Sequence, residues 1–292
     1  MFIAGIDGGG THTRLEIRDM ENRTLRREEF GPFNINSIGE DAFRKLLREI
    51  FAFCGDMAQC RKICFGAAGI SNPAVERILA EELEKAGFRG KWHLCGDQAI
   101  ALRGAMDEPG IILISGTGSI CYGRNARGET ARSGGYGHLI DDGGSGYALG
   151  RDVLSAAVRA LDGRTSDTGI LEAVCRRLGT GPEGIVPFVY NPATDKSLIA
   201  AFSSIALELA EADDVGAWNI LHTQAWELAA LVIAVQLRLE LQGCKIALLG
   251  GLIGKDNAYS RVVAEQLASL GTVVAPAHDA LWGAAQIAWE LE

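Results

Sequence analysis

The sequence lacks any cluster of basic residues of the kind that binds a nucleic-acid backbone. Acidic residues outnumber basic ones by 37 to 28, and the formal net charge is −9. The richest basic stretch, RKLLREI (44–50), alternates charged with apolar residues and is typical of one face of a helix. We therefore expect no nucleic-acid partner.

Paired cysteines are also missing. The seven cysteines are scattered and form no CxxC motif. Cys60 and Cys64 are separated by three residues, and no histidine or second cysteine pair completes a metal-binding set. This pattern is typical of free thiols in a reducing compartment.

Long hydrophobic runs are absent. The most apolar segment, LAALVIAV (228–235), is followed by Gln236 and Arg238, so it suits a buried helix better than a membrane span. The first residues, MFIAGIDGGG, have neither the basic region nor the apolar stretch of a signal peptide. These absences predict a cytoplasmic protein with no membrane partner.

The composition that remains is that of a globular protein, with 48% hydrophobic and 22% charged residues. Apolar residues recur with a period that switches between two and 3.6, which indicates alternating strands and helices. We expect strands at 2–7, 13–19, 62–69, 91–97, 245–251 and 272–277, and a strand–turn–strand unit within 110–128. We expect helices at 41–53, 74–87, from about 145, at 168–178, within 197–242, at 258–269 and from about 281.

A hairpin broken by glycines occurs twice, within 3–17 and within 111–124. Each copy leads into mixed strand and helix, which indicates a loose internal duplication of one α/β unit. The boundary is expected near MDEPG (106–110), where Pro and Gly interrupt the pattern. The predicted domains are 1–108 and 109–280, and the final helix, about 281–292, is a candidate to pack back on the first.

Glycine-rich turns can hold phosphate, because backbone N–H groups converge there without side chains in the way. Two common nucleotide loops are excluded. Gly8–Thr13 lacks the last glycine of GxGxxG and precedes a strand. In GGLIGKD (250–256), Leu249 stands where GxxxxGK[ST] needs its first glycine, and Asp256 follows the lysine.

What remains is one nucleotide held by two hairpin turns, DGGGT (7–11) and SGTGS (115–119). Asp7, at the end of the first strand, could hold Mg²⁺ through water. Either turn alone could equally be an ordinary hairpin; their recurrence at the start of both α/β cycles favours phosphate binding.

Several segments resemble those of the sugar kinase/Hsp70/actin superfamily. GIDGGGTHTR and ISGTGSICYG resemble its two phosphate segments, ALLGGLIG its adenosine segment, and DALWGAAQIA its second connecting segment. GPFNINS (31–37), GD (96–97) and SGGYGHLIDDGGSGYALGRD (133–152) resemble the N-acetylglucosamine kinase branch, or BadF/BadG/BcrA/BcrD type. The likeness is especially close to bacterial kinases acting on N-acetylmuramic acid and N-acetylglucosamine. It spans the chain and is weakest at 155–240.

The resemblance implies an α/β fold of two ribonuclease H-like (actin-like ATPase) domains, each a mixed sheet flanked by helices, with an interdomain cleft. It implies ATP and Mg²⁺ as cofactors, an amino sugar as substrate and, from relatives, a homodimer. The implied ATP-binding residues are Gly8, Gly9, Gly10, Thr11, Gly116, Thr117, Gly118, Ser119, Gly250 and Gly251, with Asp7 on the metal side. The implied substrate-binding residues are Asn34, Asp97, Gly135, Tyr136, Gly137 and Asp142.

Position alone leaves alternatives for three of these residues. Asp97 could cap a helix or orient a sugar hydroxyl and accept its proton late, and the resemblance favours the catalytic base. Asn34, which offers both a donor and an acceptor, is a sugar ligand or a turn residue. Asp142 could cap a helix or bind a sugar hydroxyl, with the sugar favoured. His138 is expected to orient its loop rather than to react.

Three residues depart from the pattern of these relatives, which usually read GWGH and GDEGSG. Tyr136 replaces Trp, Asp141 replaces Gly, and Gly143 replaces Glu. These departures affect the predicted sugar subsite and could alter which substituent on C2 or C3 is preferred. They leave the phosphate loops unchanged.

The favoured function is an ATP-dependent 6-kinase of N-acetylglucosamine, extending to N-acetylmuramic acid in cell-wall sugar recovery. Glucosamine is the alternative substrate. An ATPase that activates a dehydratase is a second class, disfavoured because the Cys-bearing AAGTG segment of such relatives is absent. A sensor of sugar or nucleotide without turnover is a third, and an intact Asp97 together with both loops argues against it.

Overall fold

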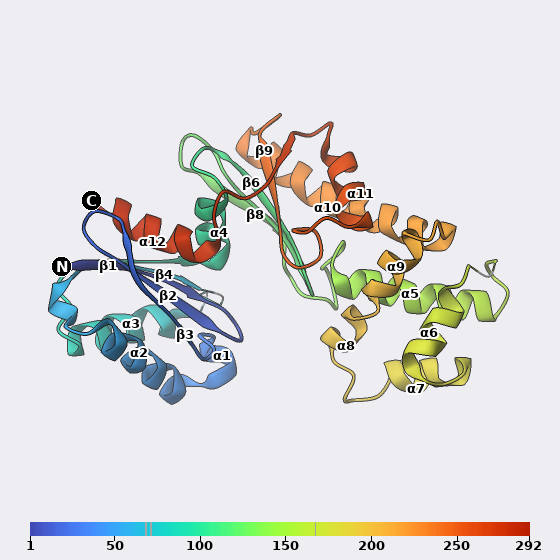
Figure 1. Cartoon of the computed structure of the whole chain (residues 1–292), viewed down its shortest axis with the longest axis horizontal. Helices are drawn as coiled ribbons and strands as arrows, with labels where there is room; N and C mark the ends of the chain where they lie inside the picture. Colours follow the sequence, from blue (N-terminus) through green and yellow to red (C-terminus); the bar gives the residue numbers. More distant parts are fainter. Residues whose placement is uncertain (68, 71, 167) are drawn as a thin grey trace. The chain divides into compact units, whose positions relative to one another are not determined.

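The computed structural model describes residues 1–67, 69–70, 72–166 and 168–292, and it divides into two compact units (Figure 1). Unit 1 consists of Met1–Glu108 and Pro276–Glu292. Unit 2 is Pro109–Ala275. Each unit contains one five-stranded mixed sheet with helices packed on it.

The sheet of unit 1 has the order β3-β2-β1-β4-β5. The first three strands are antiparallel neighbours, and β4 and β5 continue the sheet in parallel with β1. Their bounds are β1 Phe2–Gly8, β2 Thr13–Arg18, β3 Thr24–Phe30, β4 Cys60–Ala67 and β5 Lys91–Gly96. The predicted strand at 62–69 therefore begins earlier and ends at Ala67, while residue 68 lies outside the described residues.

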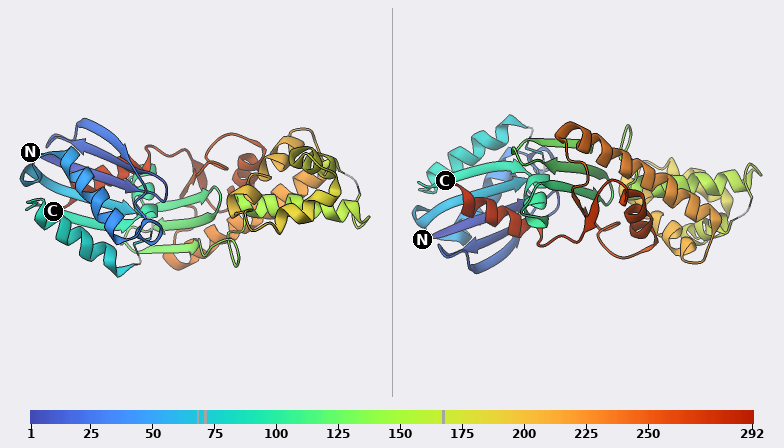
Figure 2. Two further views of the ribbon diagram at one scale, coloured as in Figure 1. Left: turned by 90° about the horizontal axis from the view of Figure 1, so that it is seen from below. Right: turned by 90° about the horizontal axis from the view of Figure 1, so that it is seen from above.

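Helices cover both faces of this sheet (Figures 1 and 2). The short α1 (Ile35–Ile38) leads into α2 (Glu40–Cys54), which lies with α3 (Pro73–Lys85) on one face. The other face carries α4 (Asp97–Ala105) and α12 (Ala280–Glu290). The predicted helix at 41–53 is confirmed, and its apolar residues are buried as its periodicity requires: Phe43, Leu46, Leu47, Ile50 and Phe51.

Unit 2 repeats the arrangement with the order β10-β9-β6-β7-β8. Its strands are β6 Gly110–Ser115, β7 Ser119–Arg124, β8 Thr130–Gly134, β9 Lys245–Leu249 and β10 Thr272–Val274. Its helices are α5 Gly146–Leu161, α6 Ile170–Leu178, α7 Ile185–Val189, α8 Lys196–Ala200, α9 Ser203–Ala210, α10 Val215–Leu239 and α11 Ala258–Leu267. The two predicted mixed sheets flanked by helices are thus confirmed.

The long helix α10 forms much of the core of unit 2. By length and composition it is the one helix of the described residues that could cross a membrane. However, it packs against β7, β8, α5 and α11, and half of its most apolar window is buried inside the unit. Its apolar composition is therefore explained by the core it fills.

In each unit the parallel strands bring their carboxyl ends to one edge of the sheet. In unit 1 these are the ends of β1, β4 and β5, and in unit 2 the ends of β6 and β9. Loops that follow parallel strands gather at such an edge, which is where α/β sheets bind ligands. Every predicted phosphate or adenosine segment leaves from one of these two edges.

Candidate active site

The edge of the unit 1 sheet brings two carboxylates together. Asp7 is the residue before the last of β1 and pairs in register with Gly66 of β4. Gly66 in turn pairs with Cys95 of β5. Asp97 follows β5 directly. The negative charge of Asp7 contributes to raising the pKa of Asp97, which shows that the two carboxylates share one electrostatic environment.

Asp97 is the first residue of α4, not the last of a strand as predicted. Gly96 occupies the N-cap position, so the capping interpretation of Asp97 is wrong. The Oδ1 atom accepts a hydrogen bond of 3.0 Å from the N–H of Gln98, which opposes the rise in pKa caused mainly by partial desolvation. The side chain of Asp97 remains exposed at this edge of the sheet.

Asp7 is held in place by an arginine that the sequence reasoning did not select. Arg14 of β2 donates to Asp7 Oδ2 at 2.6 Å and to Asp279 Oδ2 at 3.1 Å. Asp279 in turn caps α12 by accepting from the N–H of Trp282. A signal existed for Asp279, an aspartate just before a helical pattern, but nothing local linked it to Arg14.

The Asp7 carboxylate fits a Mg²⁺ site of the predicted kind. Its Oδ2 is bound by Arg14, and within the described residues no hydrogen bond engages its Oδ1. Mg²⁺ keeps several waters and takes one or two carboxylates together with phosphate oxygens. Among the described residues there is no group of three potential metal ligands, so most ligands would come from nucleotide and water.

The first glycine loop spans residues 9–12 between β1 and β2. Gly9 closes the turn, its N–H donating to His12 O at 2.9 Å and its carbonyl accepting from Phe33 N. Gly8 packs against the Phe33 ring, where a Cβ would come within 2.6 Å. Gly10 faces open space, and in the described chain neither its N–H nor that of Thr11 is engaged. These two N–H groups are therefore available to phosphate.

Asn34 has the turn role that the sequence left open, and its sugar contact stays a prediction. It caps α1, its Oδ1 accepting from Asn36 N at 3.0 Å, and it lies beside Gly69 just beyond β4. Its amide donor is not engaged elsewhere in the described residues, so it can still bind a hydroxyl at this edge.

The second glycine loop is fixed to two other segments of unit 2. Gly116 O accepts from Gly146 N at 2.7 Å, and Ser119 Oγ donates to Gly143 O at 2.7 Å. Ser115 O accepts from Leu252 N at 3.1 Å. These bonds join the loop to the N-terminus of α5 and to the adenosine segment.

A cavity of about 480 Å³ lies where these segments meet. It has the size of a small-molecule site, and the positive end of the α5 dipole, at Gly146, lines it. Its predicted members are Gly116, Thr117 and Gly251; the sequence reasoning missed Gly146, Ser197, Ala200, Ala201, Ser203 and Leu252. The serines come from α8 and the start of α9, in the stretch where no motif was recognised.

Gly250 has a different role from Gly251. Its φ is +91°, and a Cβ there would lie 2.3 Å from Ser115 O, so glycine permits the close contact between β9 and the second phosphate loop. Gly251 faces open space and lines the cavity. The structure thus brings both predicted residues to this edge, one as support and one as lining.

The predicted sugar loop of unit 2 follows β8. Gly135 and Gly137 both have positive φ, and Asp141 Oδ2 accepts from the backbone N–H of Tyr136 at 3.1 Å. Tyr136 is 62% exposed and lies under the guanidinium of Arg132. Asp141, one of the departures, therefore stabilises the loop rather than distorting it.

His138 packs edge-on against Tyr147 of α5, with ring centroids 4.7 Å apart. This contact matches the expectation that His138 orients the loop. Gly143 lies against Glu227 of α10, whose Oε2 would be 3.1 Å from a Cβ at residue 143. The space that a side chain would need at this position is thus already occupied by a carboxylate from α10.

Asp142 does not cap α5, because Ser145 holds that position and accepts from Ala148 N. Asp142 is buried, with a φ of +62°, and its Oδ1 accepts from Ser119 N at 3.4 Å. A Cβ at Gly118 would come within 3.0 Å of its carboxylate. Within unit 2 it supports the second phosphate loop; the predicted sugar contact stays a prediction.

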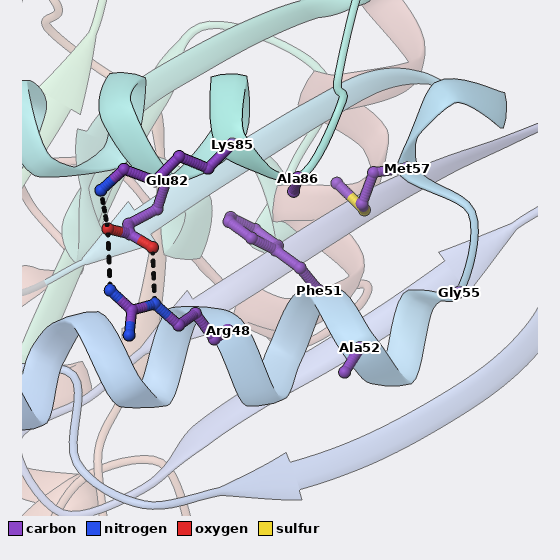
Figure 3. A pocket seen from close by; sticks show the side chains of 8 residues that line it. All are labelled: Arg48, Phe51, Ala52, Gly55, Met57, Glu82, Lys85 and Ala86. Atoms are coloured by element: carbon purple, nitrogen blue, oxygen red, sulfur yellow. Dashed lines mark hydrogen bonds and ion pairs between the residues drawn. The ribbon is translucent and has the colours of Figure 1, made fainter.

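A second hollow, of about 400 Å³, lies between the C-terminal ends of α2 and α3 (Figure 3). Its apolar lining includes Phe51 and Met57, and Arg48 and Lys85 stand at its rim on either side of Glu82. It lies near the start of β4, at the edge of the sheet opposite Asp7. None of the predicted site residues lines it.

Comparison with known proteins agrees with this geometry. The model of the BadF/BadG/BcrA/BcrD ATPase family matches residues 4–288. The chain belongs to this family. An N-acetylmuramic acid/N-acetylglucosamine kinase of Clostridium acetobutylicum is 35% identical over 265 residues, which cover 88% of this chain and 87% of that protein. An N-acetyl-D-glucosamine kinase of Dictyostelium discoideum is 28% identical over 288 residues, covering 91% and 90%.

The fold of this BadF/BadG/BcrA/BcrD family member is also found among solved structures. A structural-genomics target from Chromobacterium violaceum matches over 98% of both chains with a TM-score of 0.74 and 24% identity. A glucokinase of the ROK family from Streptomyces griseus, solved with glucose and AMPPNP, matches over 99% of both chains with a TM-score of 0.55 and 15% identity. At these identities the likeness concerns the fold alone.

Proposed function

We propose that this protein is an ATP-dependent sugar kinase that phosphorylates N-acetylglucosamine. The observation that carries the proposal is the pair of carboxylates, Asp7 and Asp97, at the carboxyl edge of the unit 1 sheet, in a chain 35% identical to an N-acetylmuramic acid/N-acetylglucosamine kinase. We extend the proposal to the 6-hydroxyl as acceptor, to N-acetylmuramic acid as a second substrate, and to recovery of cell-wall sugars in the cytoplasm.

Asp97 is the proposed catalytic base. Phosphoryl transfer has a loose transition state, so the main task of the base is to orient the attacking hydroxyl and to take its proton late. An exposed carboxylate at the first residue of α4 suits this task, because it is accessible and its backbone is fixed by a helix. Asn34 is proposed to bind a neighbouring sugar hydroxyl through its unused amide donor.

The proposed nucleotide contacts come from both units. In unit 2, Thr117 and Gly118 would offer N–H groups to phosphate, and Gly251, Ser197 and Ser203 would contact the adenosine moiety in the cavity that they border. In unit 1, Gly10 and Thr11 would offer the remaining N–H groups. We propose that unit 1 is the sugar domain and unit 2 the adenosine domain.

Mg²⁺, when bound, would neutralise the charge that develops on the transferring phosphoryl group. Asp7 would hold it through its Oδ1, directly or through water. Arg14 keeps the other oxygen of Asp7 engaged and thereby fixes the direction in which Oδ1 points. We also propose that the protein forms a homodimer, which solution scattering would test.

The proposal is tested by ADP release with Mg-ATP and, separately, N-acetylglucosamine, N-acetylmuramic acid, glucosamine and glucose. We expect sugar-dependent ADP with N-acetylglucosamine and none without Mg²⁺. N-acetylglucosamine lacking the 6-hydroxyl should give no ADP above the background without sugar. Absence of sugar-dependent ADP with all four sugars would refute the kinase, while turnover of glucosamine alone would correct the substrate.

A further inference from the structure

Two neighbouring strands that lead to the proposed active site carry a close pair of thiols. Cys64 of β4 and Cys95 of β5 have Sγ atoms 4.0 Å apart. Cys64 pairs in register with His93, and Gly66 pairs with Cys95, so both cysteines and His93 point to the same face of the sheet. The proposed phosphoryl transfer makes no use of these three residues.

The two thiols lie in different surroundings. Cys64 is fully buried beneath α12, where it contacts Ala284 and Ala288. Cys95 is only half-buried, and the exposed His93 forms a hydrogen bond with it. A small oxidant from solvent can therefore reach the Sγ atom of Cys95 before that of the buried Cys64.

Of the two thiols, Cys64 keeps its proton and Cys95 is the one that ionises. Its hydrogen bond to Cys95 lowers the pKa of the Cys95 thiol, and the neighbouring His93 lowers it further, although burial and the charge of Asp97 oppose the shift. The pKa of Cys64 is raised well above its ordinary value. The imidazole of His93 forms its hydrogen bond with Cys95, so the thiolate forms there.

The other buried cysteines of the described chain show the opposite behaviour. Burial raises the pKa of Cys54 and of Cys60 to about 12, and it also raises that of Cys121. Such thiols are inert because the reactive species is the thiolate. Cys95 differs from them because it combines partial exposure with a hydrogen-bonded histidine and a second Sγ atom 4.0 Å away.

We propose that Cys95 is a site of reversible oxidation by hydroperoxides, and that Cys64 resolves the product to a disulfide between β4 and β5. The Cys95 thiolate attacks the outer oxygen of the hydroperoxide; the O–O bond breaks, the alcohol or water leaves after taking a proton, and Cys95 becomes a sulfenic acid. The Cys64 sulfur then attacks the Cys95 sulfur, and the displaced hydroxide takes the Cys64 proton and leaves as water. A thiol reductant reverses the step by disulfide exchange.

Formation of this bond has a consequence for the neighbouring site. A disulfide needs an S–S distance of about 2.0 Å, so the two sulfurs must move toward each other. Cys95 is separated from Asp97 only by Gly96, so a shift of β5 moves the start of α4. The disulfide therefore suppresses sugar phosphorylation until it is reduced. This second part rests on the proposed function; the disulfide itself does not.

Disulfide mapping tests the proposal on the full chain. The protein is treated with hydrogen peroxide, its remaining thiols are blocked with N-ethylmaleimide, and it is digested with trypsin without reduction. We expect the peptide 63–77 joined to the peptide 92–103, and loss of this product after dithiothreitol. Peroxide treatment that leaves the two peptides separate, with Cys95 unmodified, overturns the proposal.

Thiol reactivity gives an independent measure. At pH 7 Cys95 should react with N-ethylmaleimide about tenfold faster than Cys175, which is also half-buried and which, among the described residues, forms no hydrogen bond with a second thiol. The variant His93→Gln should lower the Cys95 rate, whereas Cys175→Ser should not. In Cys64→Ala, whose folding is checked by circular dichroism, a sulfenic-acid probe such as dimedone should label Cys95. A Cys95 rate equal to or below that of Cys175 contradicts the assignment.

The effect on activity separates the two proposals. Sugar-dependent ADP release by the wild type should fall at least severalfold with peroxide and return with dithiothreitol, while Cys95→Ser should keep its activity under peroxide. Disulfide formation without any change in ADP release refutes the link to the site. A protein that never phosphorylates sugar but forms the disulfide refutes the kinase alone.

Discussion

Among individual residues, glycines and carboxylates form most of the candidate site, and adjacent glycines have different structural roles. The sequence does not distinguish Gly250 from Gly251. A Cβ at Gly250 would clash with Ser115, whereas a Cβ at Gly251 would meet open space. The motif GG predicts that a turn is present. It cannot tell which glycine supports the fold, because that depends on a strand more than a hundred residues away.

This difference predicts opposite outcomes for two matched variants. Gly250→Ala forces a positive φ on alanine and a contact with the Ser115 carbonyl, so it should lower the free energy of unfolding by about 1–3 kcal/mol. Gly251→Ala should leave stability within about 0.5 kcal/mol but weaken ATP binding, because its methyl group enters the cavity. Denaturant unfolding and nucleotide titration measure the two effects. Equal stability of both variants would contradict the assigned roles.

At the scale of elements, periodicity predicted the strands and helices that bury a face, and it failed where burial is slight. β3 (Thr24–Phe30) was missed because its residues are nearly all exposed, and so was the short edge strand β8. Pairing with β2 keeps β3 extended, with Arg27 bound to the buried Glu16 across the strands. Such edge strands are set by their partners, not by their own sequence.

The pairing of α2 with α3 depends on one buried carboxylate. Glu82 of α3 is 2% exposed and binds Arg44 and Arg48 of α2 as well as Lys85, each at 2.8 Å. Figure 3 shows the pairs with Arg48 and Lys85. Hydrogen bonds from these cations, that of Arg48 first, lower the pKa of Glu82 from 4.5 to about 2. Because the pKa is depressed in the folded state, this stabilisation is complete above pH 4.5 and lost as the pH falls toward 2.

Glu82→Gln should therefore lower the free energy of unfolding at pH 7 by about 1–3 kcal/mol and flatten its fall between pH 4.5 and 2. Glu84→Gln, on the exposed side of the same helix, should change neither. Denaturant unfolding over this range measures both variants. If the free energy of unfolding of Glu82→Gln falls as steeply between pH 4.5 and 2 as that of the wild type, Glu82 is not the titrating group.

At the scale of the whole molecule, the chain is a duplicated unit whose last helix belongs to the first half. The repeat of glycine hairpins predicted the two sheets, and both share one strand order. The sequence offered the final helix as a candidate to pack on the first half, but it could not predict the contacts, because they join residues more than 250 positions apart. Arg14 binds Asp279, and a Cβ at Gly5 would meet the backbone of Ala285 at 2.2 Å. Of the residues that line the cavity of unit 2, only Gly116, Thr117 and Gly251 were predicted, because segments distant in the sequence meet there.

Removal of Pro276–Glu292 should unfold unit 1 while unit 2 stays folded. Without α12, Cys64 of β4 and Ile100 of α4 lose their apolar cover. Hydrogen exchange should show loss of protection within 1–108 and retention within 109–275. Removing only Leu291 and Glu292, which lie beyond the helix, should change neither region. Protection of 1–108 that survives the longer deletion would contradict this role of α12.

The variant Asp97→Asn tests whether Asp97 is the base of a sugar kinase. Loss of a positioned base should reduce sugar-dependent ADP release by about 10²–10⁴-fold, while binding of N-acetylglucosamine stays within a few fold. Asp41→Asn, the same change at an exposed aspartate of α2, serves as the control and should keep full activity. Activity of Asp97→Asn at the wild-type level, measured beside this control, would contradict the account.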